Sequence, residues 1–252
     1  MPTYHRLLAV TALLASLTPI AQASERRFVY SYETLTAPKG SIELENWVTW
    51  KNTSVHGGRD LNSFQFRHEL EYAITDRLQV GFYLFDWEYD RNASHDKARW
   101  EHSGVEFIYN LTNPSTDWLG SALYFEALLG EHEVEIEGKL LLEKRFANLR
   151  IAYNAILEAA FDKRDSSQNS GEFGQTLGVS YDLTKRFSLG AEALHEIELP
   201  RWDSRGDSVV YAGPNASWRF GRGYATLAAL FQITSVNEEP DRQIRLITGF
   251  DF

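Results

Sequence analysis

Residues 64–72 read FQFRHELEY, so aromatic or apolar side chains alternate with polar or charged ones. Successive side chains of a strand point to opposite faces, and the stretch therefore predicts a strand with one apolar and one charged face. The same period of two returns in twelve segments and is the main structural signal of the chain. These segments are 41–50, 62–73, 77–88, 100–111, 118–129, 132–145, 148–161, 172–183, 185–197, 208–219, 223–234 and 241–252.

The connections between these segments are alternately short and long, except for the short Gly130-Glu131. Alternation of tight turns and long loops is typical of an outer-membrane barrel, with the turns in the periplasm. The sequence thus predicts an all-β fold: an antiparallel transmembrane β-barrel of about 12 strands, with both termini periplasmic. The long polar connections are 51–61, 89–99, 162–171, 198–207 and 235–240.

The N-terminus has the layout of a cleavable signal peptide. Arg6 precedes the apolar core 7–14, and Ala21-Gln22-Ala23 supplies the small residues that a signal peptidase recognises. We therefore expect a signal peptide over 1–23, export to the outer membrane of a Gram-negative bacterium, and a barrel over 41–252. An uncleaved anchor is the alternative for the leader. The segment 24–40 is expected to be a periplasmic lead-in or a lumen insert.

Composition excludes several functions. The formal net charge of −10 argues against nucleic acid as a partner, because nucleic-acid binding needs a basic surface. The chain has no cysteine, which excludes thiol catalysis and cysteine metal sites. His132-Glu133 and His195-Glu196 both lack the second histidine of a zinc-protease helix. We expect no catalytic residue, no metal and no cofactor.

The last segment has the pattern of a C-terminal assembly signal. Ile244, Leu246, Thr248, Phe250 and Phe252 share one face, and the chain ends on an aromatic residue. Such an ending is what barrels present to the outer-membrane assembly machinery. The expected partners are this machinery, the lipid bilayer with its lipopolysaccharide, and small solutes.

Three stretches, 40–51, 123–139 and 211–223, resemble small bacterial outer-membrane β-barrels of the transporter and uncharacterised types. The meta-pathway phenol-degradation barrel family is one of these. The resemblance implies passage of small solutes, and it carries no site residues to this chain.

The charged face of the strands is expected to line the lumen, because a charged side chain facing lipid is costly. Acids outnumber bases on this face, which predicts a channel or porin-like protein for passive passage of small solutes, cations among them. The alternative is a structural or adhesion barrel, whose lumen is filled by a lattice of charges and whose loops contact partners. The residues expected to line the pore are Arg67, Glu69, Glu71, Glu133, Glu135, Glu137, Lys139, Arg150, Glu158 and Arg245. Other acids assigned to this face are Glu43, Glu45, Glu106, Glu126, Glu172, Glu192 and Glu196.

An enzyme on the barrel wall is the third class. His68 falls on an apolar face, and pairing of segments 41–50 and 62–73 would bring Asn46 opposite it. A lipase of this kind also needs a serine nucleophile, and the next strand presents only apolar side chains on that face. We therefore expect no enzyme activity and a lipid-facing role for His68.

Overall fold

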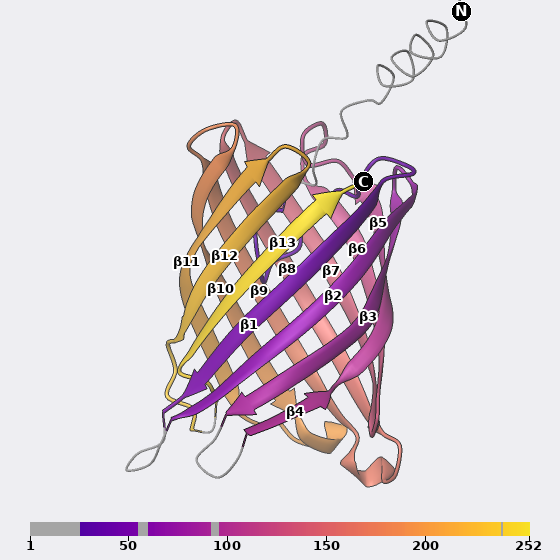
Figure 1. Cartoon of the computed structure of the whole chain (residues 1–252), viewed down its shortest axis with the longest axis vertical. Helices are drawn as coiled ribbons and strands as arrows, with labels where there is room; N and C mark the ends of the chain where they lie inside the picture. The colour runs from indigo at the N-terminus through magenta and orange to yellow at the C-terminus, as the bar shows by residue number, and fades with distance from the viewer. Residues whose placement is uncertain (1–25, 55–59, 92–95, 238) are drawn as a thin grey trace, which may run out of the picture.

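The computed structural model describes residues 26–54, 60–91, 96–237 and 239–252. The expected signal peptide and mature start lie outside these residues. The strands form one closed barrel (Figure 1). The first strand, β1 (Ile42–Thr53), pairs with the last, β13 (Arg242–Asp251), and this pairing closes the barrel.

The strands run antiparallel to their neighbours around the wall. The short β4 and the longer β5 both pair with β3 and follow each other across Glu101, so together they form one wall strand. The wall therefore has twelve strands, which confirms the predicted all-β antiparallel barrel. The other strands are β2 (Leu61–Thr75), β3 (Leu78–Arg91), β4 (Asp96–Trp100), β5 (His102–Thr112), β6 (Gly120–Gly130), β7 (Glu133–Phe146), β8 (Leu149–Asp162), β9 (Ser170–Asp182), β10 (Phe187–Leu199), β11 (Ser208–Phe220) and β12 (Gly223–Gln232).

The segment 89–99 was predicted as a long loop, and this prediction is wrong for most of its length. Here β3 continues to Arg91 and pairs with β4. Arg99 forms ion pairs with Glu88, at 3.1 Å, and with Asp90 on the paired strand. Ion pairs of this kind satisfy a polar strand pair, so polar composition alone did not distinguish strand from loop here.

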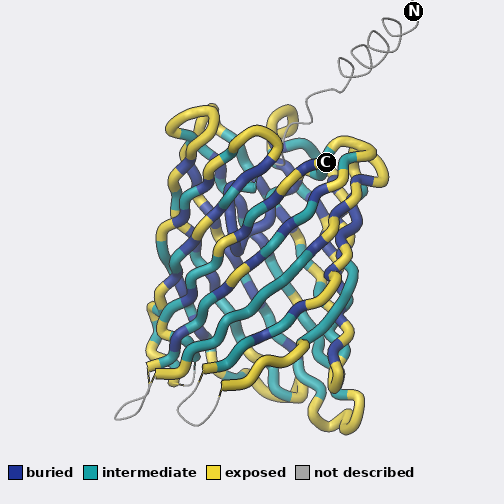
Figure 2. The backbone as a smooth tube through the Cα atoms, in the orientation of Figure 1, coloured by how far each residue is buried: buried dark blue, intermediate teal, exposed yellow. Residues whose placement is uncertain are grey.

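Buried and more exposed residues alternate along the strands (Figure 2), as expected when successive side chains point to the lumen and to the outside in turn. This arrangement follows from the period of two, because one face of every strand must point inward. No helix in the described part of the chain is long and apolar enough to cross a membrane. Large apolar side chains are exposed on the outside along the wall, among them Phe82, Phe107, Phe125, Leu140, Leu157, Leu177, Leu189, Leu227 and Phe250.

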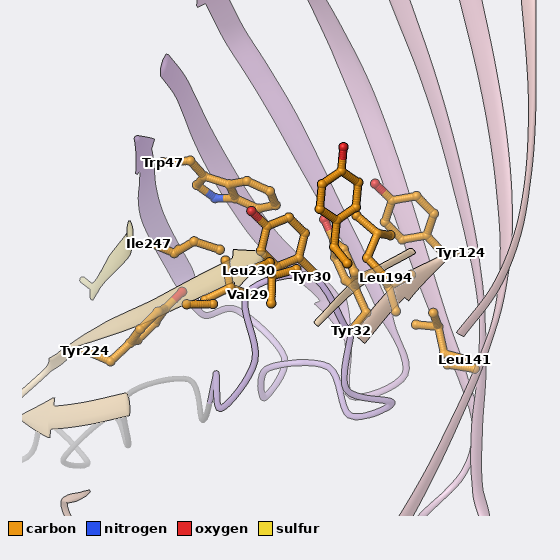
Figure 3. Packing of buried hydrophobic residues seen from close by; sticks show 14 of the residues in the cluster. Val29, Tyr30, Tyr32, Trp47, Tyr124, Leu141, Leu194, Tyr224, Leu230 and Ile247 are labelled. Atoms are coloured by element: carbon orange, nitrogen blue, oxygen red, sulfur yellow. The ribbon is translucent and has the colours of Figure 1, made fainter. Parts of the chain in front are cut away.

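Residues 26–40, called the insert from here on, precede β1, and residues 27–32 lie buried in the lumen. Phe28 and Val29 are fully buried, and Arg27 is only 1% exposed. The aromatic rings of Tyr30 and Tyr32 pack among apolar side chains of the wall (Figure 3). Residues 27–32 of the expected segment 24–40 therefore lie inside the barrel, and residues 24 and 25 lie outside the described residues.

Gly40 makes the turn from the insert into β1. Its φ of 87° lies in the left-handed region, where a residue without Cβ is favoured. The Gly40 N–H donates to the Ala73 carbonyl at 2.8 Å. The insert is thus fixed to the barrel at its C-terminal end by the start of the first strand.

The two ends of the barrel differ. One end carries the short connections, such as 76–77 and 147–148, together with the start of β1 and the end of β13 (Figure 1). The opposite end carries longer connections, including 163–169 and 200–207, which contain the short helices η1 (Ser166–Gln168) and η2 (Pro200–Trp202). We call them the short-turn end and the long-loop end.

Candidate functional site: the charged lumen

Cross-strand pairing lines up glutamates from successive strands. Glu43 pairs with Glu71, which pairs with Gly81, which in turn pairs with Glu106. Beyond Glu106, each strand from β6 to β10, both included, contributes one glutamate to this line of cross-strand partners. We call this line the acidic stripe, and its members are Glu43, Glu71, Glu106, Glu126, Glu137, Glu158, Glu172 and Glu198.

The acidic stripe crosses the whole height of the wall. Strands of a barrel are tilted, so a line of cross-strand partners climbs along the barrel axis. Glu43 is the second residue of β1, at the short-turn end, whereas Glu198 is the last but one of β10, at the long-loop end. The stripe therefore connects the two ends through the lumen.

Basic side chains compensate the middle of the stripe. Arg67 lies 3.6 Å from Glu126 and 2.7 Å from Asp86, and Lys139 lies 2.8 Å from Glu137. Lys139 also lies over the Tyr124 ring, 4.2 Å from its centroid. Charge is thus nearly balanced at mid-height.

The short-turn end of the stripe has more acids than bases. Glu45 and Glu69 pair with each other across β1 and β2, and each lies two residues along its strand from the stripe. Arg26 of the insert pairs with Glu45 at 3.0 Å, and Tyr224 donates its hydroxyl to the same carboxylate. Both oxygens of Glu69 are buried and receive no hydrogen bond from the described residues.

The long-loop end of the stripe opens into a cavity of about 320 Å³. Its lining combines acids and bases of the wall with Tyr30 of the insert. The charged residues around it are Lys51, Glu137, Lys139, Glu172, Glu196, Glu198, Asp207, Glu239 and Arg245.

The insert is held by wall side chains that bond to its backbone. Glu192 accepts hydrogen bonds from the N–H groups of Val29, Tyr30 and Ser31 at 2.8, 2.8 and 2.9 Å. Asn154 accepts from the Tyr32 N–H at 2.6 Å and donates to the Tyr32 carbonyl at 3.1 Å. These bonds satisfy buried backbone groups that no strand partner satisfies.

Ion pairs add to these anchors. Arg27 pairs with Asp182 at 2.9 Å, and Glu33 with Arg150 at 3.3 Å. Burial, and then the neighbouring Glu143 carboxylate, raise the pKa of Glu33, although Arg150 opposes the shift. Glu33 also closes the insert on itself by accepting the Arg27 N–H at 2.9 Å.

A second cavity, of about 370 Å³, lies on the short-turn side of the insert. Wall residues Glu45, Glu71 and Asp251 line it together with insert residues such as Tyr32 and Pro38. The insert therefore separates two lumen cavities, one toward each end of the barrel.

The predicted pore-lining residues fall mostly on the lumen face. Glu69 and Glu71 are buried at the short-turn end, and Arg150 holds the insert. Glu133, the first residue of β7, is exposed at the long-loop end. The remaining members on the lumen side of their strands are Arg67, Glu135, Glu137, Lys139, Glu158 and Arg245.

Sequence reasoning missed the insert residues and several wall acids. Arg26, Arg27 and Tyr30 were not among the predicted lining, and their only sequence signal is the run of large side chains at 27–32. Glu143 and Glu198 were also missed, although each lies in phase with acids already assigned to the lumen on its strand.

Comparisons with solved structures show the same fold. The COG4313 outer membrane channel from Pseudomonas putida F1 is 16% identical, with a TM-score of 0.66 over 89% of this chain and 100% of that one. The translocator domain of the autotransporter NalP from Neisseria meningitidis is 11% identical, with a TM-score of 0.53 over 98% and 94%. The KdgM porin, solved with disordered oligogalacturonate, is 10% identical, with a TM-score of 0.51 over 84% and 99%.

These likenesses support the resemblance to outer-membrane barrels. No curated protein matches the chain. The phenol-degradation barrel family, named from the sequence, is not the family that the comparison finds. Residues 20–246 match the family described as a family of unknown function, DUF6662, and the chain belongs to that family.

Proposed function

We propose that this protein is an outer-membrane channel for small cations, whose lumen the insert closes at rest. The observation that carries the proposal is the acidic stripe, which runs from one end of the lumen to the other. Rings and rows of carboxylates on an inward face favour cations over anions. The short-turn end then faces the periplasm, as tight turns do in such barrels.

The charge balance along the stripe supports cation entry from either side. Its two ends line the two cavities, through Glu71 on one side and Glu172 and Glu198 on the other. Only the middle is paired with Arg67 and Lys139. Acids at both mouths concentrate cations there, and the balanced middle avoids trapping them.

The insert has the features of a removable plug. It forms no strand pair with the described wall, and side chains such as Glu192 and Asn154 hold it. Releasing it would leave the closing pairs of β1 and β13 in place. A plug of this kind can move without unfolding the barrel.

The alternative is a structural or adhesion barrel with a filled lumen. The hydrogen bonds and ion pairs between wall and insert favour this alternative if the insert is never released. In that case the protein would act through its long loops. The two functions separate on conduction, because a permanently filled barrel passes no current whatever holds its insert.

The test is single-channel conductance of protein purified from bacterial outer membranes. We expect rare, small openings for the native protein, and frequent larger openings for Glu192→Ala combined with Asn154→Ala. Under a salt gradient the reversal potential should be cation-selective. The matched control is Glu135→Ala, which removes a lumen carboxylate with no described bond to the insert. A folded double variant that stays silent, or that selects anions, would contradict the proposal.

We further propose that residues 1–23 are a cleaved leader and that the barrel is not an enzyme. The mass of the protein in the outer membrane tests the leader, since cleavage before Ser24 removes 1–23. An uncleaved mass would contradict it.

A further inference from the structure

We propose that five lumen carboxylates at the short-turn end bind a hard divalent cation of the calcium class. The inference is independent of channel function, because it concerns equilibrium binding in a folded barrel. The five residues, called the glutamate cluster, are Glu43, Glu45, Glu69, Glu71 and Glu106.

Strand register builds the cluster. Glu43 pairs with Glu71 and Glu45 with Glu69 across β1 and β2, while Glu106 comes from β5, beyond Gly81. Two triads share Glu71, and in each triad one carboxylate oxygen from each residue lies within 4.8 Å of the other two. Oxygens on opposite sides of a calcium ion are about 4.6–5.2 Å apart, since each bond is about 2.3–2.6 Å long.

The cluster is buried, and its five carboxyl groups outnumber the positive charge placed against them. All five glutamates are less than 9% exposed, and Glu69 is fully buried. Arg26 is the cation placed against the cluster, and its ion pair goes to Glu45. Tyr83 donates to Glu106, and Gln79 donates to Glu71 at 2.7 Å.

Glu69 gives the most direct evidence for a bound ligand. Neither of its oxygens receives a hydrogen bond from the described residues, and no salt bridge reaches it there. A buried carboxylate without a donor costs several kcal/mol unless it coordinates a cation or gains a proton. Oxygen ligands in this number and spacing suit calcium.

Two glycines make room for the carboxylates of the cluster. A Cβ at Gly81 would collide with the side chains of Glu69 and Glu106, and a Cβ at Gly249 would collide with Glu43 and Tyr224. A side chain at either of these inward positions of β3 and β13 would therefore displace the glutamates from the places they hold in the cluster.

An ion can reach the cluster from the short-turn end. The cavity of about 370 Å³ has Glu45 and Glu71 in its lining, together with Ser41 from the start of the barrel. This cavity lies on the short-turn side of the insert, so binding does not require the insert to move.

Trp47 provides a built-in reporter. Its indole N–H donates to Glu45 Oε2 at 2.7 Å, which places the ring beside the cluster. Terbium replaces calcium at oxygen sites and emits when a nearby indole absorbs light. Terbium bound at the cluster should therefore show emission sensitised by Trp47.

The experiment uses the purified native barrel, stripped with a chelator in detergent. We expect saturable, near-stoichiometric calcium binding by calorimetry, and terbium emission that added calcium displaces. Glu71→Gln, which alters both triads, should weaken calcium binding at least about tenfold, whereas Glu131→Gln, on the exposed connection between β6 and β7, should leave it unchanged. Heat-modifiable mobility on gels verifies that each variant is folded.

Trp47→Phe keeps the test decisive if Glu71→Gln does not fold. With excitation at a wavelength that indole absorbs and phenol does not, this variant should lose most of the sensitised emission, while calcium binding by calorimetry persists. Absence of calcium binding by the native barrel would overturn the proposal and mean that protons neutralise the cluster. Binding that Glu71→Gln leaves unchanged, or indole-excited terbium emission that Trp47→Phe does not reduce, would overturn it as well.

Discussion

Among single residues, Glu192 makes the largest number of hydrogen bonds to the backbone of the insert. One carboxylate accepts three successive backbone N–H groups of the insert, and a fourth donor, Asn215, reaches it at 3.0 Å. A buried N–H left without its acceptor costs about 1–3 kcal/mol. The population of the bound insert therefore depends strongly on this side chain.

The absence of cysteine in the native chain makes this dependence measurable. Ser31→Cys places a thiol in the insert at a position only 1% exposed, so labelling should be slow. Adding Glu192→Ala should speed labelling by about 5–150-fold, the factor that corresponds to about 1–3 kcal/mol. Equal rates in the two backgrounds would show that Glu192 does not hold the insert.

Glu33 gives the insert a pH dependence. Its raised pKa means that the folded state favours the protonated acid, so the contribution of Glu33 to insert binding is present at low pH and falls as pH rises through the folded pKa. The charged groups around it are Arg27, Glu143, Arg145 and Arg150.

We therefore predict that the accessibility of Ser31→Cys rises with pH more steeply than that of an exposed cysteine at Ser204. Glu33→Gln, which cannot ionise, should flatten the difference. A pH profile unaffected by this substitution would assign the effect to other groups.

His68 tests the non-enzymatic proposal. Its ring lies 2.8 Å from Asn46 Oδ1 on the outer face and packs against Phe85. This hydrogen bond satisfies two polar groups that would otherwise face lipid. His68→Phe should leave the barrel folded and phospholipid hydrolysis at background in both proteins. Hydrolysis by the native protein that the variant loses would establish a lipase.

At the scale of strands, register creates the acidic stripe from residues far apart in the sequence. Two neighbouring strands that slip by two residues would keep every glutamate inward and still break the stripe. The stripe is therefore a property of pairing, with the tight turns, such as the one at Ala147 with its φ of 49°, fixing that register.

Charge reversal along the stripe should change selectivity without changing the fold. Glu172→Lys with Glu198→Lys places two cations at the long-loop mouth, where the side chains meet water. In the insert-released background we expect the reversal potential to shift toward anions. The matched control reverses Glu133, which is exposed and lies outside the stripe. A shift as large from Glu133→Lys would mean that general charge, rather than the stripe, sets selectivity.

The sequence predicts the strands of this barrel but not their register. Alternation in stretches such as 64–72 shows each strand and its inward face, because the period of two is a local property. Register is not local, so Glu43 and Glu106 could not be placed in one cluster from the sequence. The insert was ambiguous because residues 28–32 resemble a strand but have no partner strand to confirm it.

At the scale of the whole molecule, the barrel wall and the insert are distinct parts. The wall closes through the pairs between β1 and β13, such as Val48 with Leu246. The insert fills the lumen between two cavities and bonds to the wall through side chains. We propose that removing the insert opens a conducting path through the lumen.

The most direct measurement is the single-channel conductance of a variant lacking residues 26–36, compared with the native protein in the same bilayer and salt gradient. We expect a folded barrel that changes from mostly closed to stably open and cation-selective. A folded deletion variant that remains closed would contradict the proposal, because the lumen would then be sealed by the wall side chains themselves.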